Sequence, residues 1–322
     1  IREFEGRGVS FCASCDAFFY RGKKVAVIGA GPAGIVVAVK LAQEGYGMTI
    51  FERMQKIGGM LRYGIPDFRL PPSTLDRYAE KLLTLGIHIR PNTTIGGAIS
   101  VDDLFRDGYE AIFMGTGAWR AKSLGIHGET LGNCHFAVNY LQNPDVYHLG
   151  DRVAVIGSGN SAMDVARTAI RKGSRYVTIY ARRNGISASE RELEYALMDG
   201  CEIQYAKGIH SVTPEGPMMY DRVFDENQKL IGEGEPYLIP ADSTVIAASQ
   251  AAKDKIVRTT TGIHLNEKGL VKVDENGMTD RDGVFSAGDV VFGPWNVVQV
   301  VKEAKHTADA MIQYLKAREA NV

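Results

Sequence analysis

The chain has 322 residues, a length that favours two compact domains. Its formal net charge of −1 excludes a general electrostatic attraction to nucleic acid or to a membrane surface. No apolar run reaches the ~20 residues of a membrane span, no secretory signal opens the sequence, and four cysteines are too few for a disulfide scaffold, so we expect a cytoplasmic protein.

The first stretch, residues 1–23, contains two cysteines separated by two residues and followed directly by an acid: Cys12, Cys15 and Asp16. Two thiols at this spacing suit reversible disulfide chemistry, because the ring that they close is small and one thiolate is readily activated. The stretch is therefore a candidate redox segment.

A strand–turn–helix pattern follows, with the string "VAVIGAGPAG" from Val25. We expect a strand over Val25–Ile28, a helix from Pro32 to about Gly45 and a strand over Met48–Glu52. In such a unit the first glycine makes the tight turn and the second lets a phosphate reach the backbone, while the third lets helix and strand pack closely. Those positions are Gly29, Gly31 and Gly34.

After a loop rich in glycine and proline, a helix is expected near Ser73–Leu85 and a strand over Ile87–Arg90. The string "AIFMGTG" then predicts a further strand that ends at Gly117. Alternation of helices and strands indicates an α/β fold with a parallel sheet.

The glycine pattern recurs as "VAVIGSGNSA" from Val153, 128 residues after its first copy. This second unit starts at Arg152 and continues through a strand over Tyr176–Tyr180 and a helix near Ser189–Asp199. One glycine pattern is weak evidence, but two in the same strand–turn–helix context predict two bound dinucleotides with electron transfer between them.

The last part of the chain differs in pattern. Residues from about Ile209 to Leu238 are rich in turn formers, which predicts a small antiparallel hairpin. The tail from Val297 to Ala317 has the period of one amphipathic helix.

The end of the second strand in each unit indicates which dinucleotide is bound. "MTIFER" places Glu52 23 residues beyond Gly29, where a carboxylate accepts hydrogen bonds from a ribose 2′-hydroxyl. The aligned "VTIYARR" has Ala181 there, followed by Arg182 and Arg183, which suit a 2′-phosphate. The alternative for the arginine pair is a solvated strand end, but the contrast with Glu52 favours NADP at the second site.

From Lys24 onward the sequence resembles the small (β) subunit of bacterial glutamate synthase and its relatives. These proteins belong to the two-dinucleotide flavoprotein superfamily that includes thioredoxin reductase. The resemblance rests on the strings "IGAGPAG", "FERMQKIGGMLRYGIPDFRLP", "GTGA", "IGSGNSAMDVARTAIRKG", "ARRN" and "SAGDVVFGP".

The resemblance implies two Rossmann-like domains, with the NADP-binding domain inserted into the FAD-binding domain. The expected division is an N-terminal Cys-x-x-Cys segment over residues 1–23, an FAD-binding domain over 24–146 and 265–322, and an NADP-binding domain over 147–264. The implied cofactors are FAD and NADPH.

The resemblance also implies roles for residues in the FAD-binding domain. Glu52 would hold the adenosine ribose, Asp289 would meet the ribityl–phosphate region, and the start of the last helix would stabilise negative charge on the reduced flavin. The alternative for Asp289 is a turn-forming acid after a strand. The implied FAD-binding residues are Gly29, Gly31, Pro32, Ala33, Gly34, Glu52, Arg53, Gly59, Arg62, Ile65, Arg69, Thr116, Gly117, Gly288, Asp289, Val297 and Val298.

In the second unit the implied NADP-binding residues are Gly157, Gly159, Asn160 and Ser161 in the turn, with Arg182 and Arg183 as the phosphate clamp. Arg191 either adds to that clamp or is an exposed helix arginine. Hydride transfer from nicotinamide to flavin needs orientation and exclusion of water more than an acid or base. No histidine is therefore a catalytic candidate, and no spacing predicts a metal site.

The N-terminal stretch resembles the redox segment of thioredoxin reductase. That resemblance implies Cys15 beside the flavin, Cys12 as the exchanging thiol and Asp16 as the acid. In thioredoxin reductase, however, the cysteine pair precedes the NADPH unit, whereas here it precedes the FAD unit. Glutamate synthase small subunits instead have an N-terminal iron–sulfur region, so a working dithiol, an inert pair and metal ligation with residues upstream of Ile1 all remain open.

Three functions follow from these observations. The first is an NADPH:FAD oxidoreductase of the glutamate-synthase-small-subunit type, which passes electrons to a larger subunit, an iron–sulfur protein or another acceptor. The second is a disulfide reductase that uses Cys12 and Cys15 on a thioredoxin-like partner. The third is a nucleotide-binding subunit without turnover. A homodimer is compatible with each.

Overall fold

The computed structural model describes residues 23–319, so Cys12, Cys15 and Asp16 lie outside the described part of the chain. The chain forms two compact units. Unit 1 contains the residues up to Arg62, Leu70–Arg120 and the residues from Ala251 on, and unit 2 contains Tyr63–Arg69 and Ala121–Gln250. Unit 2 is thus inserted into unit 1 along the sequence. The boundaries expected from the sequence, after residues 146 and 264, lie later in the chain than these division points.

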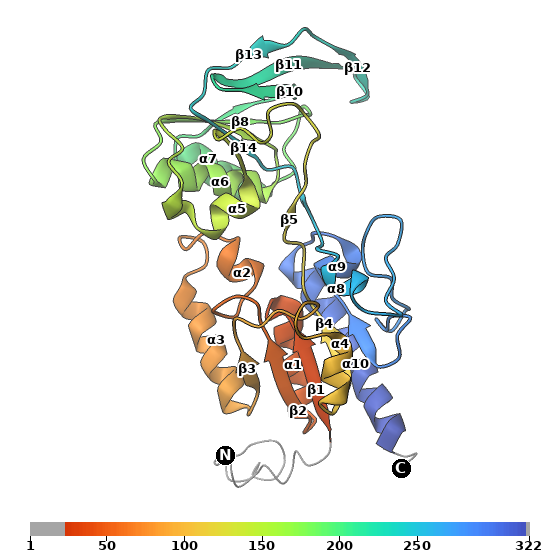
Figure 1. The fold of residues 1–322 in the computed structure, drawn as a ribbon. Coiled ribbons are helices and arrows are strands. Elements are labelled where there is room, and N and C mark those ends of the chain that lie inside the picture. The colour runs from red at the N-terminus through yellow and green to blue at the C-terminus, as the bar shows by residue number, and fades with distance from the viewer. Residues whose placement is uncertain (1–22, 320–322) are drawn as a thin grey trace. The chain divides into compact units, whose positions relative to one another are not determined.

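Unit 1 is built from a parallel sheet with helices on both faces (Figure 1). Its strands are β1 (Lys24–Ile28), β2 (Gly47–Phe51), β3 (His88–Arg90), β4 (Tyr109–Met114) and β16 (Val284–Ser286). Its helices are α1 (Pro32–Gln43), α2 (Met60–Tyr63, whose last residue is assigned to unit 2), α3 (Pro72–Thr84), α4 (Val101–Arg106), α8 (Lys255–Arg258), α9 (Asp289–Phe292) and α10 (Val297–Glu319). The strand order is β16-β4-β1-β2-β3, with β1 at the centre.

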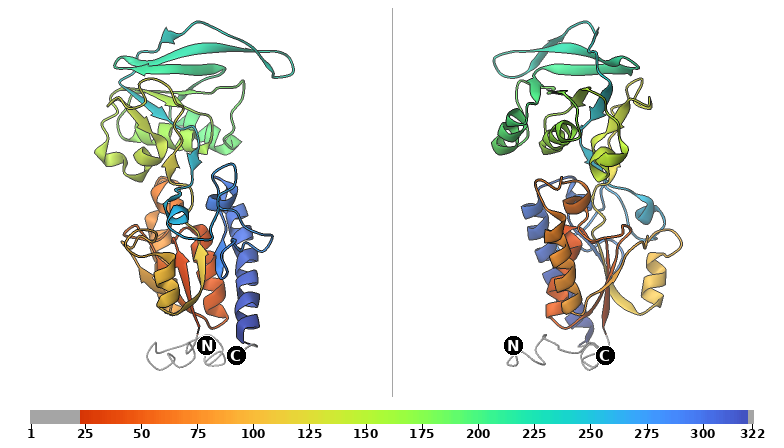
Figure 2. Two further views of the ribbon diagram at one scale, coloured as in Figure 1. Left: turned by 45° about the vertical axis from the view of Figure 1, so that its right-hand side comes forward. Right: turned by 90° about the vertical axis from the view of Figure 1, so that its left-hand side faces the viewer.

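The central strand shows why both faces of this sheet are covered. Its side chains alternate between the two faces, since successive residues of a strand point to opposite sides. Val25 and Val27 pack in a core with α1, α3 and α10, while Ala26 and Ile28 pack in a second core with α4, α8 and α9 (Figure 2). A strand that is buried on both faces is a continuous apolar run, as "VAVI" is.

Unit 2 repeats this plan with a different outer layer. Its parallel sheet has the order β6-β14-β7-β8-β9, and its antiparallel strands are β10 to β13. The strands are β6 (Cys134–Phe136), β7 (Arg152–Ile156), β8 (Tyr176–Tyr180), β9 (Glu202–Gln204), β10 (Lys207–Thr213), β11 (Gly216–Phe224), β12 (Leu230–Glu233), β13 (Tyr237–Leu238) and β14 (Ser243–Ile246). The helices are α5 (Ala137–Gln142), α6 (Asn160–Arg171) and α7 (Glu190–Met198), with a 3-10 turn over Pro144–Val146.

In unit 2 the helices cover one face of the parallel sheet and the antiparallel strands cover the other. Val153 and Val155 of β7 pack with α5, α6 and α7, whereas Ala154 and Ile156 pack with Met219 of β11. The two short strands β5 (Arg120–Ala121) and β15 (Gln250–Ala251) pair with each other, and the chain divides into its two units within them.

The predicted α/β class with two parallel-sheet units is confirmed. The strand over Tyr176–Tyr180 has the predicted bounds, and the expected hairpin forms as part of a larger antiparallel sheet. The predicted end of β4 at Gly117 is wrong, because β4 ends at Met114, and Gly115 and Thr116 after it lie beside Gly29. In the part of the chain that the structure describes, no helix has the length and apolar composition to cross a membrane.

Candidate functional site

Three glycines lie in or next to the turn between β1 and α1. Two of them are required by the fold, and the third is not. Gly29 has a φ of +97°, and a Cβ there would lie 2.6 Å from the carbonyl oxygen of Gly115. A Cβ on Gly34 would lie 1.9 Å from the carbonyl oxygen of Gly29, so only glycine lets α1 pack against this turn. These two positions are required by the fold itself.

Gly31 is different, because nothing in the protein excludes a side chain there. Its φ of −76° suits any residue, and a Cβ would have only the Cα of Gly59 within 4 Å, at 3.9 Å. Gly31 is the N-cap of α1, which has Pro32 next to it, no side-chain cap and no acid in its first turn. The free N–H groups of such a helix start attract an anion. The space at Gly31 therefore fits a phosphate that approaches the backbone.

Other predicted FAD-binding residues of unit 1 surround this turn. Gly59 is so close that its Cβ would lie 2.7 Å from the Cα of Gly31, and Gly288 lies against Ala33 on α1. Thr116 lies beside Gly29, and Gly117 follows it with a φ of +69°. The hydroxyl oxygen of Thr116 is buried and has no hydrogen-bond partner among the described residues. A buried polar atom without a partner favours a bound ligand at this place.

Glu52 lies at the end of β2 with only 4% of its surface exposed. One carboxylate oxygen accepts a hydrogen bond from the N–H of Ala30 at 2.7 Å, and the other accepts one from the N–H of Met54 at 2.8 Å. Each oxygen keeps a free lone pair for a hydroxyl. Arg53 is exposed and stacks on the ring of Trp119 at 4.5 Å.

Two arginines of the predicted FAD loop form ion pairs with acidic side chains of the protein. Arg62 is nearly buried, and it donates to the carbonyl oxygen of Ile57 and to Asp76 of α3, both at 2.7 Å. Ile65 and Arg69 belong to unit 2, where Arg69 binds Asp164 of α6 and Glu192 of α7.

The C-terminal part of unit 1 contributes Asp289 and the start of α10. Burial raises the pKa of Asp289 to about 6, and its side chain accepts a hydrogen bond from the N–H of Trp295 at 3.2 Å. Val297 and Val298 are exposed at the N-terminus of α10, where Asn296 caps the helix by accepting from the N–H of Gln299. This N-terminus presents the positive end of a long helix dipole.

The turn of unit 2 has the same pattern of constraint. Gly157 has a φ of +147°, and a Cβ there would lie 2.6 Å from the carbonyl oxygen of Ala247. Gly159, the N-cap of α6, has a φ of −89° and only the hydroxyl of Ser187 within reach, at 3.8 Å. Asn160 accepts a hydrogen bond from the N–H of Ser189, and Ser161 follows in the first turn of α6. Gly159 therefore leaves the same kind of space as Gly31.

Arg182 and Arg183 follow β8 after the buried Ala181, and both are exposed. Their backbone is fixed, because the carbonyl oxygen of Arg182 accepts from Arg222 and that of Arg183 accepts from Ala206. Within the described residues neither guanidinium has a hydrogen bond or an ion pair. Arg191, by contrast, donates to the hydroxyl of Tyr195 at 3.2 Å. Two unpaired arginines on a fixed loop suit an anionic ligand.

The remaining thiols are not reactive. Cys134 and Cys201 are both buried, and burial raises the pKa of each thiol to about 11, as expected for cysteines that serve as small apolar residues. In residues 23–319 no group of three or more histidine, cysteine or acidic side chains has the arrangement of a metal site.

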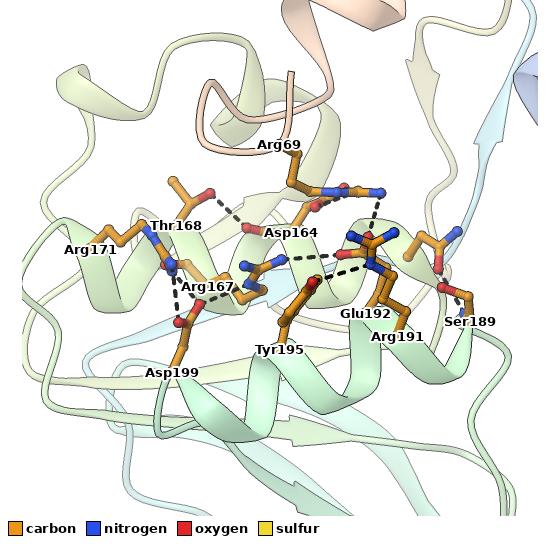
Figure 3. A network of polar contacts seen from close by, with 11 residues as sticks. Arg69, Asp164, Arg167, Thr168, Arg171, Ser189, Arg191, Glu192, Tyr195 and Asp199 are labelled. Atoms are coloured by element: carbon orange, nitrogen blue, oxygen red, sulfur yellow. Dashed lines mark hydrogen bonds and ion pairs between the residues drawn. The ribbon is translucent and has the colours of Figure 1, made fainter. Parts of the chain in front are cut away.

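Unit 2 contains an ionic network that was not predicted from the sequence. Its side chains are Asp164, Arg167 and Arg171 of α6, Glu192 of α7, Asp199 directly after α7, and Arg69 (Figure 3). The signal was present in "DVARTAIR", where an acid and two arginines recur at positions i, i+3 and i+7 on one helix face.

The sequence profile of a family described as "Pyridine nucleotide-disulphide oxidoreductase" matches residues 23–308. The NADP(+)-dependent formate dehydrogenase subunit beta of Moorella thermoacetica is 34% identical over 319 residues, which is 92% of this chain and 44% of that protein. The glutamate synthase [NADPH] small chain of Halomonas elongata is 32% identical over 323 residues, 91% of this chain and 68% of that protein. The chain thus spans less than half of the first relative and about two thirds of the second.

A solved structure has a similar fold. The FprA protein of Mycobacterium tuberculosis in complex with NADPH gives a TM-score of 0.78 with 18% identity, covering 94% of this chain and 86% of that protein. At this identity the likeness supports the fold of two dinucleotide-binding domains.

Proposed function

Because the chain is an oxidoreductase of the pyridine nucleotide-disulphide oxidoreductase family, we propose that unit 1 binds FAD and that unit 2 binds NADPH. The observation that carries the proposal is the pair Gly31 and Gly159. Neither glycine is required by its φ or by its neighbours, yet each lies at the uncapped start of a helix. Room for a phosphate explains both.

The residues of unit 1 fit FAD. Gly31 and Gly59 leave backbone N–H groups open to a pyrophosphate, and Glu52 has acceptor capacity for the ribose hydroxyls. FAD would give the buried hydroxyl of Thr116 a partner, and the half-buried Asp289 would accept a hydrogen bond from its polyol chain. The helix dipole of α10 opposes the cost of negative charge near its N-terminus. FAD, when bound, supplies the hydride acceptor and the store for two electrons.

The residues of unit 2 fit NADPH. Gly159 and Asn160 bring the start of α6 to the pyrophosphate, while Arg182 and Arg183 offer two charge-assisted forks to the 2′-phosphate. Their backbone is already fixed, so little order is lost when the ligand binds. We therefore propose NADPH rather than NADH as the electron donor.

The names of the relatives suggest which acceptor receives the electrons from FAD. Two of them are named as subunits of a formate dehydrogenase and of glutamate synthase, so we propose that this chain also delivers electrons to a partner subunit. Reduction of a disulfide partner through Cys12 and Cys15 remains a second prediction, which rests on the Cys-x-x-Cys-Asp string alone. The cytoplasmic location likewise stays a prediction.

An anaerobic titration tests the donor side of this proposal. Purified protein with bound FAD is titrated with NADPH and, separately, with NADH while the flavin absorbance is followed. We expect bleaching at lower concentrations of NADPH than of NADH. Protein that binds no flavin, or a bound flavin that neither nucleotide reduces, contradicts the proposal. The function that then remains is the third one, a nucleotide-binding subunit without turnover.

A cysteine variant separates the two acceptors. If Cys12→Ser with Cys15→Ser keeps the reduction of an artificial dye but loses the reduction of a thioredoxin-type disulfide, the dithiol is functional. If the wild-type protein reduces no disulfide, the second prediction is wrong.

A further inference from the structure

The loop between β8 and α7 carries Arg182 and Arg183 and is held at its far end by the turn of unit 2. The N–H groups of Ser187 and Ala188 both donate to the carbonyl oxygen of Ser158, at 2.9 and 2.8 Å. One residue later the N–H of Ser189 donates to Asn160 at 3.0 Å. The position of this loop therefore depends on how α6 and α7 lie against each other.

Arg69 joins these two helices with one side chain (Figure 3). One terminal nitrogen lies 2.7 and 2.6 Å from the two carboxylate oxygens of Asp164 on α6. The other lies 2.8 Å from the nearer oxygen of Glu192 in the first turn of α7. Only the rigid, planar fork of an arginine can hold two carboxylates in this way.

The two acids need this cation because both are largely buried. Asp164 and Glu192 have side chains that are 5% and 11% exposed. Arg167 of α6 also binds Glu192, at 3.1 Å, but makes no such contact with Asp164. Without Arg69, two carboxylates would repel each other across α6 and α7 next to the turn.

Arg69 reaches the two helices from the segment Tyr63–Arg69, which belongs to unit 2 although Arg62 and Leu70 on either side belong to unit 1. Phe68 strengthens this attachment, since its ring lies 4.7 Å from the guanidinium carbon of Arg167 and 4.1 Å from that of Arg171. The segment Tyr63–Arg69 thus completes the helix pair of its own unit, unit 2.

We propose that Arg69 is a positioning residue for NADPH: it holds α6 to α7, and with them the loop that carries Arg182 and Arg183. This inference rests on the proposed function of unit 2. It places in one network the side chains that set the shape of the nucleotide site without touching the nucleotide.

The test separates KM from kcat in the NADPH-dependent reduction of an artificial dye by the FAD-loaded protein. We expect Arg69→Gln to raise the KM for NADPH on the order of tenfold, while kcat at saturating NADPH stays near the wild-type value. Arg69→Lys keeps the charge but not the planar fork, so its KM for NADPH should lie between those of the wild type and Arg69→Gln. The matched control is Arg175→Gln, which removes an exposed arginine paired with Asp151 at 3.7 Å, and its KM should equal the wild-type value.

A second variant removes the link without leaving a buried charge unpaired. Arg69→Met with Asp164→Leu replaces the ion pair by apolar side chains, an exchange that proteins often tolerate. If circular dichroism shows this variant folded, its KM for NADPH should still be raised. The inference is overturned if Arg69→Gln and the double variant both have the wild-type KM for NADPH, or if they lower kcat and leave KM unchanged. Wild-type protein that does not bind NADPH overturns instead the proposed function on which it rests.

Discussion

Asp164 shows at the scale of one residue how burial and pairing compete. Its carboxylate bonds to Arg69, yet burial is the larger effect and raises its pKa from the ordinary range of an aspartic acid to about 6. In the unfolded chain the group titrates near its ordinary pKa. Between these two values the folded protein holds a proton that the unfolded chain has lost.

This difference predicts the sign of a pH effect on stability. Because the folded state binds more protons in this window, the contribution of Asp164 is fully present below its unfolded pKa and is lost as pH rises through about 6. Asp164→Asn removes the titration. We expect the free energy of unfolding of the wild type, minus that of the variant, to fall by up to ~3 kcal/mol from pH 4 to pH 7.

Urea unfolding of both proteins at several pH values measures this difference. Other titrating groups, including Asp289 with its pKa raised to about 6, are present in both proteins and cancel. If the free energy of unfolding of the wild type minus that of Asp164→Asn stays level or grows with pH, Asp164 is not protonated in the folded state above its ordinary pKa.

At the scale of elements, the loop after β8 carries the preference between NADPH and NADH. Each unpaired guanidinium of Arg182 and Arg183 offers charge-assisted bonds that only a 2′-phosphate can accept. We expect Arg182→Ala with Arg183→Ala to raise the KM for NADPH on the order of a hundredfold and to leave the KM for NADH unchanged.

Arg191→Ala serves as the comparison for this loop, because Arg191 is engaged with Tyr195 on its own helix. Its KM for NADPH should move little. Steady-state kinetics with both nucleotides decide the matter: an equal loss with NADPH and NADH in the double variant would assign the arginines to the fold rather than to the 2′-phosphate.

The elements also show what the sequence could predict. The core strand–turn–helix units were foreseen because β-branched runs before glycine turns are strong local signals, and β8 has the predicted bounds. The short strands β6, β14 and β16 were missed because three or four residues carry little periodic pattern, and only pairing with β7 or β4 defines them.

The placement of Arg69 was beyond a local pattern. It occurs in a string with Gly59 and Arg62, and the family resemblance implied that this loop passes close to FAD. The partner that the structure gives Arg69 is Asp164, 95 residues away in the chain. Contacts at such separation depend on tertiary structure that no motif in this segment encodes.

At the scale of the whole molecule, the chain contains two βαβ motifs, one in each of two units that have separate cores. Gly29 and Gly34 in unit 1, and Gly157 in unit 2, are required by the fold, whereas Gly31 and Gly159 leave room that the protein itself does not fill. The account therefore depends on the statement that each of these two glycines faces a different dinucleotide.

Equilibrium binding of FAD and of NADP⁺ to Gly31→Ala and Gly159→Ala tests that statement directly, with Gly132→Ala as control, since Gly132 has nothing within 4 Å of a Cβ. All three variants should keep the wild-type fold. The account predicts that Gly31→Ala weakens only FAD and Gly159→Ala weakens only NADP⁺, each on the order of tenfold. Unchanged affinities, or losses at the opposite sites, would contradict it.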